Sequence, residues 1–202
     1  EGNTSNNLAL DFGFFNNRIG GSVEVYDRKT TDLLLSQTVA WTSGFGGITS
    51  NVGRVQNKGI EVTLNGTLLK SNSADGFTWN TNFVFAYNKS KLLELFGETQ
   101  NIGTAYVVGQ PLFLVQAAPF AGVNPATGRA MWYDSTGNLT YQIQTPKDNR
   151  IIGDELPEYT GGLTNTLSYK GFTLDVFFQY EYGRLVSDGQ VNFLSESSGR
   201  IN

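Results

Sequence analysis

The sequence of 202 residues contains no cysteine and no histidine. Without cysteine it can form neither a disulfide nor a zinc–thiolate site, and it has no thiol nucleophile. Without histidine it lacks the commonest general base and the commonest transition-metal ligand. The chain alone therefore cannot build a Ser-His-Asp or Cys-His catalytic device, and we expect no enzyme activity, no metal site and no cofactor.

Charged residues and long apolar runs are also scarce. Charged residues make up 16% of the chain, compared with roughly 25% in a typical soluble domain. The net charge of −4 lacks the basic footprint of a nucleic-acid-binding protein, so no nucleic acid is expected as a partner. No apolar run is long enough for a transmembrane helix, and the first seven residues are too polar to open a signal peptide. We expect the sequence to be a piece of a longer polypeptide.

Glycine and aromatic residues are plentiful, and apolar residues alternate with polar ones along several segments. The chain has 24 glycines, and 13% of its residues are aromatic. Alternation with a period of two is typical of strands that have one apolar face, and it predicts an all-β, antiparallel fold. About six strands are expected, at approximately 8–15, 22–35, 55–65, 77–93, 160–169 and 172–183.

The expected connections alternate between short and long. Short turns follow the first, third and fifth strands, and Lys170-Gly171 is predicted to be a tight hairpin turn. Long irregular loops are expected at about 36–54 and 94–159. Outer-membrane β-barrels have short turns at one rim and long extracellular loops at the other. The pattern therefore favours part of a large transmembrane β-barrel.

A soluble β-sandwich with one buried face would give the same alternation. Such a molecule could act as a carbohydrate-binding module that uses aromatic side chains on its loops. A loop of about 65 residues is uncommon in a compact sandwich, and this favours the barrel. A carboxylate-pair glycosidase is a third hypothesis, with Asp134, Asp148, Asp154 and Glu155 as candidate acids.

Four segments resemble the C-terminal part of the barrel in the SusC/RagA group of TonB-dependent receptors. They are residues 8–35, 51–64, 106–134 and 151–183, and they occur in the order typical of that family. The stretches NKGIE (57–61) and PEYTGG (157–162) are the most similar to it. Together the four segments cover most of the chain, so residues 1–202 are identified as a partial receptor barrel.

The resemblance implies a location in the outer membrane of a Gram-negative, Bacteroidetes-like bacterium. It implies import of an oligosaccharide or peptide, a SusD-like surface lipoprotein as partner, contact with outer-membrane lipid, and coupling to the TonB complex through a plug region. The plug, the TonB box and most of the roughly 22 strands of a full member do not occur in this sequence.

The candidate ligand-binding residues are aromatic and fall on the predicted extracellular loops. Trp41, Trp132 and Tyr133 could stack on sugar rings, although packing within the loops is the simpler interpretation. Residues 134–138 could present oxygens to calcium, but a turn closed by the Asp134 side chain is favoured. Asn57, Lys58 and Gly59 are expected to form the entry to the third strand, where glycine supplies backbone freedom.

Overall fold

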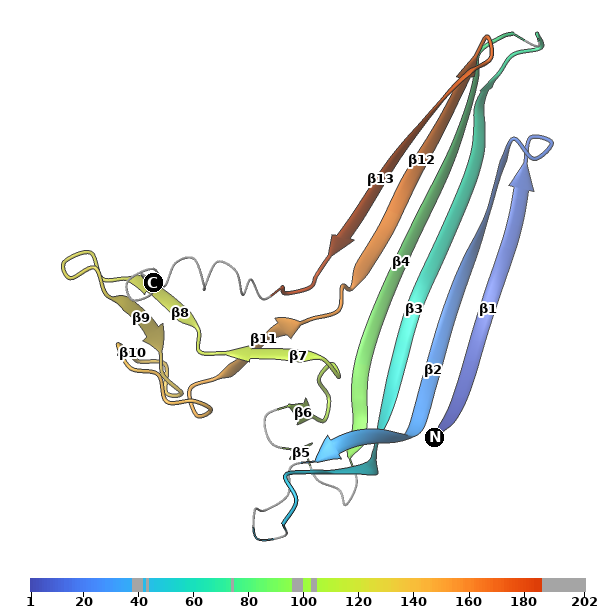
Figure 1. The fold of residues 1–202 in the computed structure, drawn as a ribbon. Coiled ribbons are helices and arrows are strands. Elements are labelled where there is room, and N and C mark those ends of the chain that lie inside the picture. Colours follow the sequence, from blue (N-terminus) through green and yellow to red (C-terminus); the bar gives the residue numbers. More distant parts are fainter. Residues whose placement is uncertain (38–41, 43, 74, 96–99, 103–104, 187–202) are drawn as a thin grey trace.

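The computed structural model describes residues 1–37, 42, 44–73, 75–95, 100–102 and 105–186, and it is dominated by one sheet of six long antiparallel strands (Figure 1). The sheet order is β1-β2-β3-β4-β12-β13. Within the described residues neither β1 nor β13 is paired along its outer edge, so the sheet does not close on itself. Its strands are β1 (Gly2–Phe14), β2 (Ile19–Gln37), β3 (Ile48–Lys70), β4 (Thr78–Leu95), β12 (Tyr159–Tyr169) and β13 (Phe172–Tyr182).

The described part of the segment between β4 and β12 contains seven short strands. This segment is the long loop expected at about 94–159, and it is irregular between these strands but paired within them. β5 pairs with β6, β7 pairs with β11, and β8, β9 and β10 form a small sheet of their own. The bounds are β5 (Asn101–Ile102), β6 (Tyr106–Val107), β7 (Leu114–Ala117), β8 (Phe120–Val123), β9 (Ala130–Tyr133), β10 (Leu139–Thr140) and β11 (Arg150–Asp154). We call residues 100–158 the insertion.

The three short turns lie at one end of the large sheet, and the long connections lie at the other (Figure 1). The turn of residues 15–18 joins β1 to β2, and residues 71–77 join β3 to β4. Lys170 and Gly171 join β12 to β13, and both have positive φ, 48° and 81°. A two-residue turn of this kind matches the twist of its strands, and glycine adopts it without steric cost. The predicted hairpin turn is therefore confirmed.

The large sheet is a single layer. Among the described residues only Val55, Leu92 and Leu95 form a buried apolar core. The molecule exposes 14450 Å² of surface, whereas a compact monomer of this size exposes roughly 9,300 Å². Phe178 and Leu174 in β13 are 60% and 58% exposed. No second sheet in the described part of the chain covers the face that carries Phe178 and Leu174, so the β-sandwich hypothesis is wrong.

The small core lies where the insertion meets the end of the large sheet. Val55 on β3 is paired with Leu92 on β4, and Leu33, Ile102, Tyr106, Val108 and Leu112 pack around them. The backbone N–H of Leu92 donates to the carbonyl of Gln110 (2.8 Å), and the N–H of Gly109 donates to the carbonyl of Leu92 (2.8 Å). The insertion thus continues the edge of β4 beyond the point where β12 ends. Among the described residues, no helix is long and apolar enough to cross a membrane.

Candidate functional site

The register of the six long strands separates their side chains into an apolar face and a polar face. Paired residues on neighbouring antiparallel strands point to the same side of a sheet, and successive residues point to opposite sides. One row across all six strands is almost wholly apolar or aromatic: Leu8, Val25, Ile60, Tyr87, Tyr159 and Tyr182. The next row lies on the opposite face: Ala9, Glu24, Glu61, Ala86, Thr160 and Glu181.

The apolar face has the height of a bilayer core. Its aromatic limits on β12 are Tyr159 and Tyr169, which are ten residues apart. At about 3.3 Å per residue these span about 33 Å along the strand, and a tilt of 35–45° reduces the height to about 23–27 Å. The apolar band of outer-membrane barrels is about 25 Å tall. We call this band the apolar belt.

Both limits of the apolar belt carry aromatic side chains. At the long-loop limit, the Tyr159 ring lies 5.1 Å from that of Tyr87 and 6.2 Å from that of Tyr182. At the short-turn limit, the indole N–H of Trp79 donates to the side-chain oxygen of Asn165 (3.0 Å). This bond satisfies an amide that would otherwise face the apolar side without a partner. Aromatic girdles at both interfaces are typical of membrane barrels.

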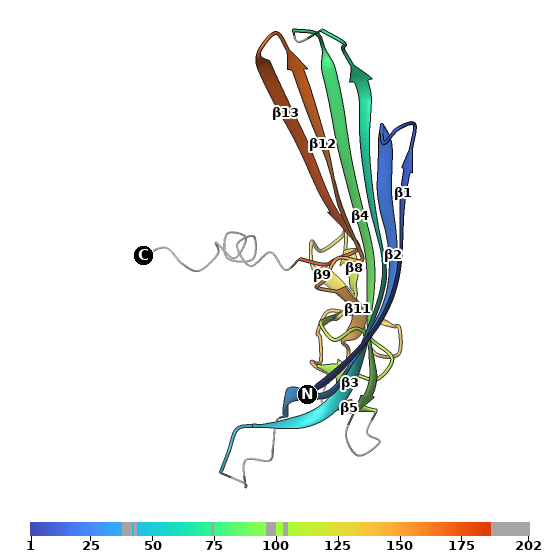
Figure 2. The same cartoon turned by 90° about the vertical axis from the view of Figure 1, so that its right-hand side faces the viewer.

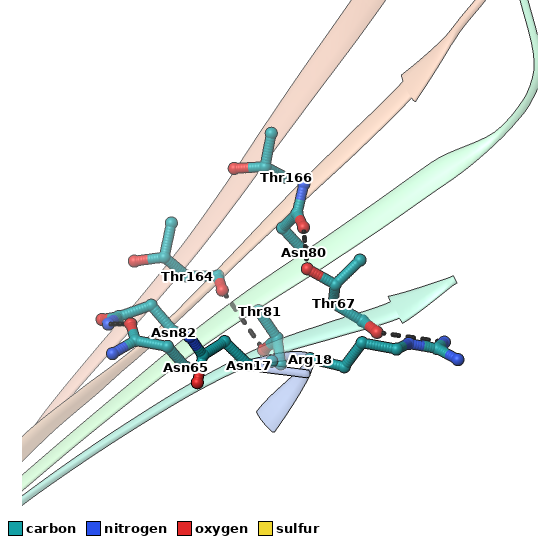
Figure 3. Close-up of a pocket in the computed structure, with 10 residues that line it drawn as sticks. Asn17, Arg18, Asn65, Thr67, Asn80, Thr81, Asn82, Thr164 and Thr166 are labelled. Carbon is teal, nitrogen blue, oxygen red and sulfur yellow. Dashed lines mark hydrogen bonds between the residues drawn. The ribbon is translucent and has the colours of Figure 1, made fainter. Parts of the chain in front are cut away.

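The polar face is hollowed near the short-turn end (Figure 3). The hollow has a volume of about 230 Å³, and β3, β4 and β12 supply most of its lining. The amide of Asn82 donates to Asn65 (2.6 Å), and the hydroxyl of Thr67 donates to Asn80 (2.8 Å). We call the following set the polar patch: Asn65, Thr67, Asn80, Asn82, Thr164 and Thr166. Its members are uncharged and can both donate and accept hydrogen bonds.

Among the described residues, Arg18 is the only charged one that lines this hollow, and its guanidinium is bonded to the end of β3. Its guanidinium donates to the backbone carbonyls of Thr67 (3.4 Å) and Leu68 (3.2 Å). The polar patch is therefore suited to neutral, hydroxyl- or amide-bearing solutes. Along residues 77–93 Asn80 and Asn82 alternate with Trp79, Thr81 and Phe83, which indicates a polar face. The sequence does not reveal the patch, because only the strand register brings Asn65, Asn82 and Thr164 side by side.

A tyrosine crosses one strand on the polar face nearer the long-loop end. The hydroxyl of Tyr26 on β2 donates to the side-chain oxygen of Asn88 on β4 (3.0 Å), and Gly59 on β3 lies beneath the ring. A Cβ at Gly59 would overlap the Tyr26 ring and the carbonyl of Tyr87. The interpretation of Gly59 as a flexible entry to the third strand is therefore wrong. β3 begins at Ile48, and Gly59 is needed because it leaves room for the ring.

Trp132 and Tyr133, two of the aromatic residues predicted to bind ligand, do not form one platform. Trp132 and Tyr133 are consecutive on β9, so their side chains point to opposite sides of that strand. The Trp132 ring packs edge-to-face against Phe120, with 6.2 Å between ring centroids. Tyr133 is 39% exposed and accessible to a ligand. Trp41 lies outside the described residues.

The carboxylates of the insertion stabilise turns. One oxygen of Asp134 accepts hydrogen bonds from the N–H and hydroxyl of Thr136 and from the N–H of Asn138, which is the turn that the sequence favoured. Asp148 is buried and accepts from the N–H groups of Gln144 (2.7 Å) and Ser135 (2.9 Å). Among the described residues, no group of three or more potential ligands could hold a metal ion.

These hydrogen bonds also set the charge of the two carboxyl groups. The bond from the Thr136 hydroxyl, with the N–H of Asn138, lowers the pKa of Asp134 below its usual value. The N–H groups of Gln144 and Ser135 lower the pKa of Asp148. A glycosidase needs a carboxylic acid with a raised pKa as its proton donor. Neither Asp134 nor Asp148 suits that role.

The side of the sheet on which the insertion packs follows from the register. Val55 and Leu92 continue the same face as Gly59 and Asn88, which is the polar face. The N–H of Asn88 donates to the carbonyl of Glu158 (2.9 Å), which fixes the point where the insertion returns to the sheet. Figure 2 shows the short strands gathered near the end of the sheet opposite the hairpin turns. The insertion therefore partly covers the long-loop end of the polar face.

Comparison with known proteins gives consistent matches. A family model described as TonB dependent receptor-like, beta-barrel, matches residues 1–194. TonB-dependent receptor P26 of Formosa agariphila is 30% identical over 92% of this chain and 21% of its own length. TonB-dependent receptor SusC of Bacteroides thetaiotaomicron is 35% identical over 48% of this chain and 10% of its own length.

Solved structures agree with these relatives. A structure of the RagAB peptide transporter aligns with a TM-score of 0.78 and 30% identity, over 90% of this chain and 21% of the matched chain. The RagAB peptide importer in its 'open-open' state aligns with a TM-score of 0.76 and 28% identity. The chain spans about a fifth of the length of TonB-dependent receptor P26. Its open sheet is consistent with part of a larger barrel.

Proposed function

Because this chain belongs to the TonB-dependent receptor-like β-barrel family, we propose that residues 1–202 form a segment of the barrel wall of an outer-membrane nutrient importer. The apolar belt faces lipid, and the polar face lines the passage for the solute. The insertion is the extracellular part of the segment. The chain acts by shape and by hydrogen bonding, and it catalyses no reaction.

The apolar belt is the observation that carries this proposal. Many of its side chains are exposed, its height of about 23–27 Å matches the bilayer core, and both of its limits are aromatic. The opposite face of the same strands carries the polar patch. In the described part of the chain no second sheet covers the apolar face, and the opposite face is polar, which suits a wall between lipid and water.

The nutrient and the partners follow from the family. The cargo is an oligosaccharide or a peptide; RagAB is named a peptide transporter. A SusD-like lipoprotein covers the extracellular side, and the TonB complex acts through a plug encoded outside this segment. The uncharged polar patch supports a cargo rich in hydroxyl or amide groups. Tyr133 and Trp132, with Trp41 on the other long loop, are the proposed aromatic contacts at the entrance.

The membrane orientation can be tested with two matched serine-to-cysteine variants of the full-length receptor, because this segment has no cysteine of its own. Ser135 lies on the insertion, and Ser73 lies in the turn between β3 and β4; both are exposed. In intact cells a membrane-impermeant maleimide should label Ser135→Cys and should leave Ser73→Cys unlabelled until the outer membrane is permeabilised. Equal labelling of the two variants, or absence of the protein from the outer-membrane fraction, would contradict the proposal.

A further inference from the structure

Charged residues replace apolar ones on the apolar face directly beyond the tyrosine limit of the apolar belt. The first row outside the belt contains Asn6, Asp27, Lys58 and Lys89. The second row contains Thr4, Lys29, Gln56 and Lys91. Four lysines therefore occupy two rows of three neighbouring strands, and all four are exposed. We call Lys29, Lys58, Lys89 and Lys91 the basic patch.

The basic patch carries more positive charge than its surroundings neutralise. The ammonium of Lys58 lies 3.3 Å from Asp27, and that of Lys89 lies 3.9 Å from Glu158. Asp27 also accepts a hydrogen bond from Gln56 (2.7 Å). Among the described residues, Lys29 and Lys91 form no ion pair. The patch is thus cationic in a chain whose net charge is −4.

Two carboxylates, Asp27 and Glu158, neutralise only half of the charge of the four lysines, which leaves a repulsion that a further anion would relieve. Lys58 and Lys89 are directly paired on β3 and β4, and like charges in that position destabilise a sheet. The side chains are 59% and 63% exposed, so each is accessible from outside. From β2 to β4 the patch is about 10 Å wide, at about 4.8 Å between strands. An anionic group seated between the lysines would offset their repulsion.

We propose that the basic patch binds the phosphate groups of an anionic lipid whose acyl chains lie along the apolar belt. The proposal rests on the membrane placement argued above, which puts the basic patch at headgroup level in the leaflet on the long-loop side. Lysine is a point charge suited to phosphate, and its long stem can lie on apolar surface while the ammonium reaches the headgroup. Tyr87 and Tyr159 separate the two regions, at the depth where aromatic rings prefer to lie.

The test is native mass spectrometry of the full-length receptor in detergent, titrated with lipid A that carries two phosphates. Phosphatidylcholine and inorganic phosphate are the comparison ligands. The variant is Lys58→Gln/Lys89→Gln. The matched control, Lys70→Gln/Lys170→Gln, removes two lysines at the short-turn end. Lys58→Arg/Lys89→Arg preserves the charge and reports on folding.

The double glutamine variant should bind diphosphorylated lipid A about 30-fold more weakly, which corresponds to about 1 kcal/mol for each lysine. The control and the arginine variant should bind it as the unmodified receptor does, and phosphatidylcholine binding should be equal in all four proteins. Equal lipid A affinity in the glutamine variant and the control would overturn the proposal. Displacement of the lipid by millimolar inorganic phosphate would identify a free-phosphate site and would also overturn it.

The outcome separates this site from the proposed function. A receptor that labels at Ser135→Cys as expected but shows no lysine-dependent lipid binding would disprove only the lipid site. A receptor absent from the outer membrane would disprove both proposals.

Discussion

An arginine placed at mid-height on the apolar face should destabilise the barrel, whereas an arginine at the next residue should not. Leu163 and Thr164 are consecutive near the middle of β12, and their side chains point to opposite faces. Leu163 is paired with Phe83 and Phe178 within the apolar belt. Thr164 lines the polar patch. The two substitutions therefore introduce the same charge at the same depth, one toward lipid and one toward water.

The magnitude follows from the depth within the bilayer. Arginine on the lipid face costs about 2–4 kcal/mol at the midplane and about 0–1 kcal/mol near the interfaces. Leu163 is four residues from Tyr159 and six from Tyr169, close to the midplane of the apolar belt. We expect a loss of about 2–4 kcal/mol for Leu163→Arg, and less than about 1 kcal/mol for Tyr169→Arg at the rim. Thr164→Arg should change the free energy of unfolding little, because the new side chain points into the water-filled interior of the barrel.

The assay is reversible folding of the full-length receptor into lipid vesicles, followed as a function of urea by the mobility shift between folded and unfolded protein. The midpoint for Leu163→Arg should fall while the slope remains unchanged. Equal destabilisation by Leu163→Arg and Thr164→Arg would refute the two-faced arrangement. An equal cost at Leu163 and Tyr169 would refute the placement of the apolar belt.

Three further predictions concern individual hydrogen bonds and contacts. Tyr26→Phe removes the bond to Asn88 and should lower the free energy of unfolding by about 0.5–1.5 kcal/mol, with no further loss when Asn88 is also replaced by alanine. Gly59→Ala should cost about 1–3 kcal/mol because the new Cβ overlaps both the Tyr26 ring and the backbone carbonyl of Tyr87, and only the part of this cost that comes from the ring should disappear in a Tyr26→Ala background. The pKa of Asp148 is lowered in the fold, so its stabilisation of the turn should be complete above the ordinary value of 3.8 and should be lost as the pH falls further, toward the folded-state pKa. Amide hydrogen exchange of a peptide covering residues 134–149 should become faster as the pH falls through this range. Asp148→Asn should show the same loss of protection at neutral pH. Unchanged protection in the variant would contradict the role of the carboxylate.

The long strands were predictable from the sequence because one face is apolar and the other polar, so apolar and polar residues alternate with a period of two. In the segment 8–15 the alternation of Leu8, Leu10, Phe12 and Phe14 predicts the apolar face of β1, and the register confirms it with Val25 and Val23 opposite. The Lys170-Gly171 turn was predictable because two-residue hairpins require positive φ. The extensions of β1 to Gly2 and of β3 to Ile48 were missed, since those ends are polar and lie beyond the apolar belt, where no alternation is imposed.

The short strands of the insertion were missed for a related reason. Strands of two to five residues are too brief to show periodicity, and they form because their partners and the end of the sheet hold them. The same holds for Trp132. An aromatic side chain on a predicted loop suggested a ligand contact, and only the tertiary structure shows that Phe120 packs against the Trp132 ring.

By itself the sequence determined that the chain is all-β, that its strands have one apolar and one polar side, and that short and long connections alternate. Those properties are local, because backbone geometry and neighbouring residues impose them. Only the tertiary structure decided which residues meet across strands: Asn65 with Asn82, Tyr26 with Asn88 over Gly59, and Lys58 beside Lys89. A shift of register by one residue would exchange the two faces, so the position of each side chain depends on pairing between distant segments.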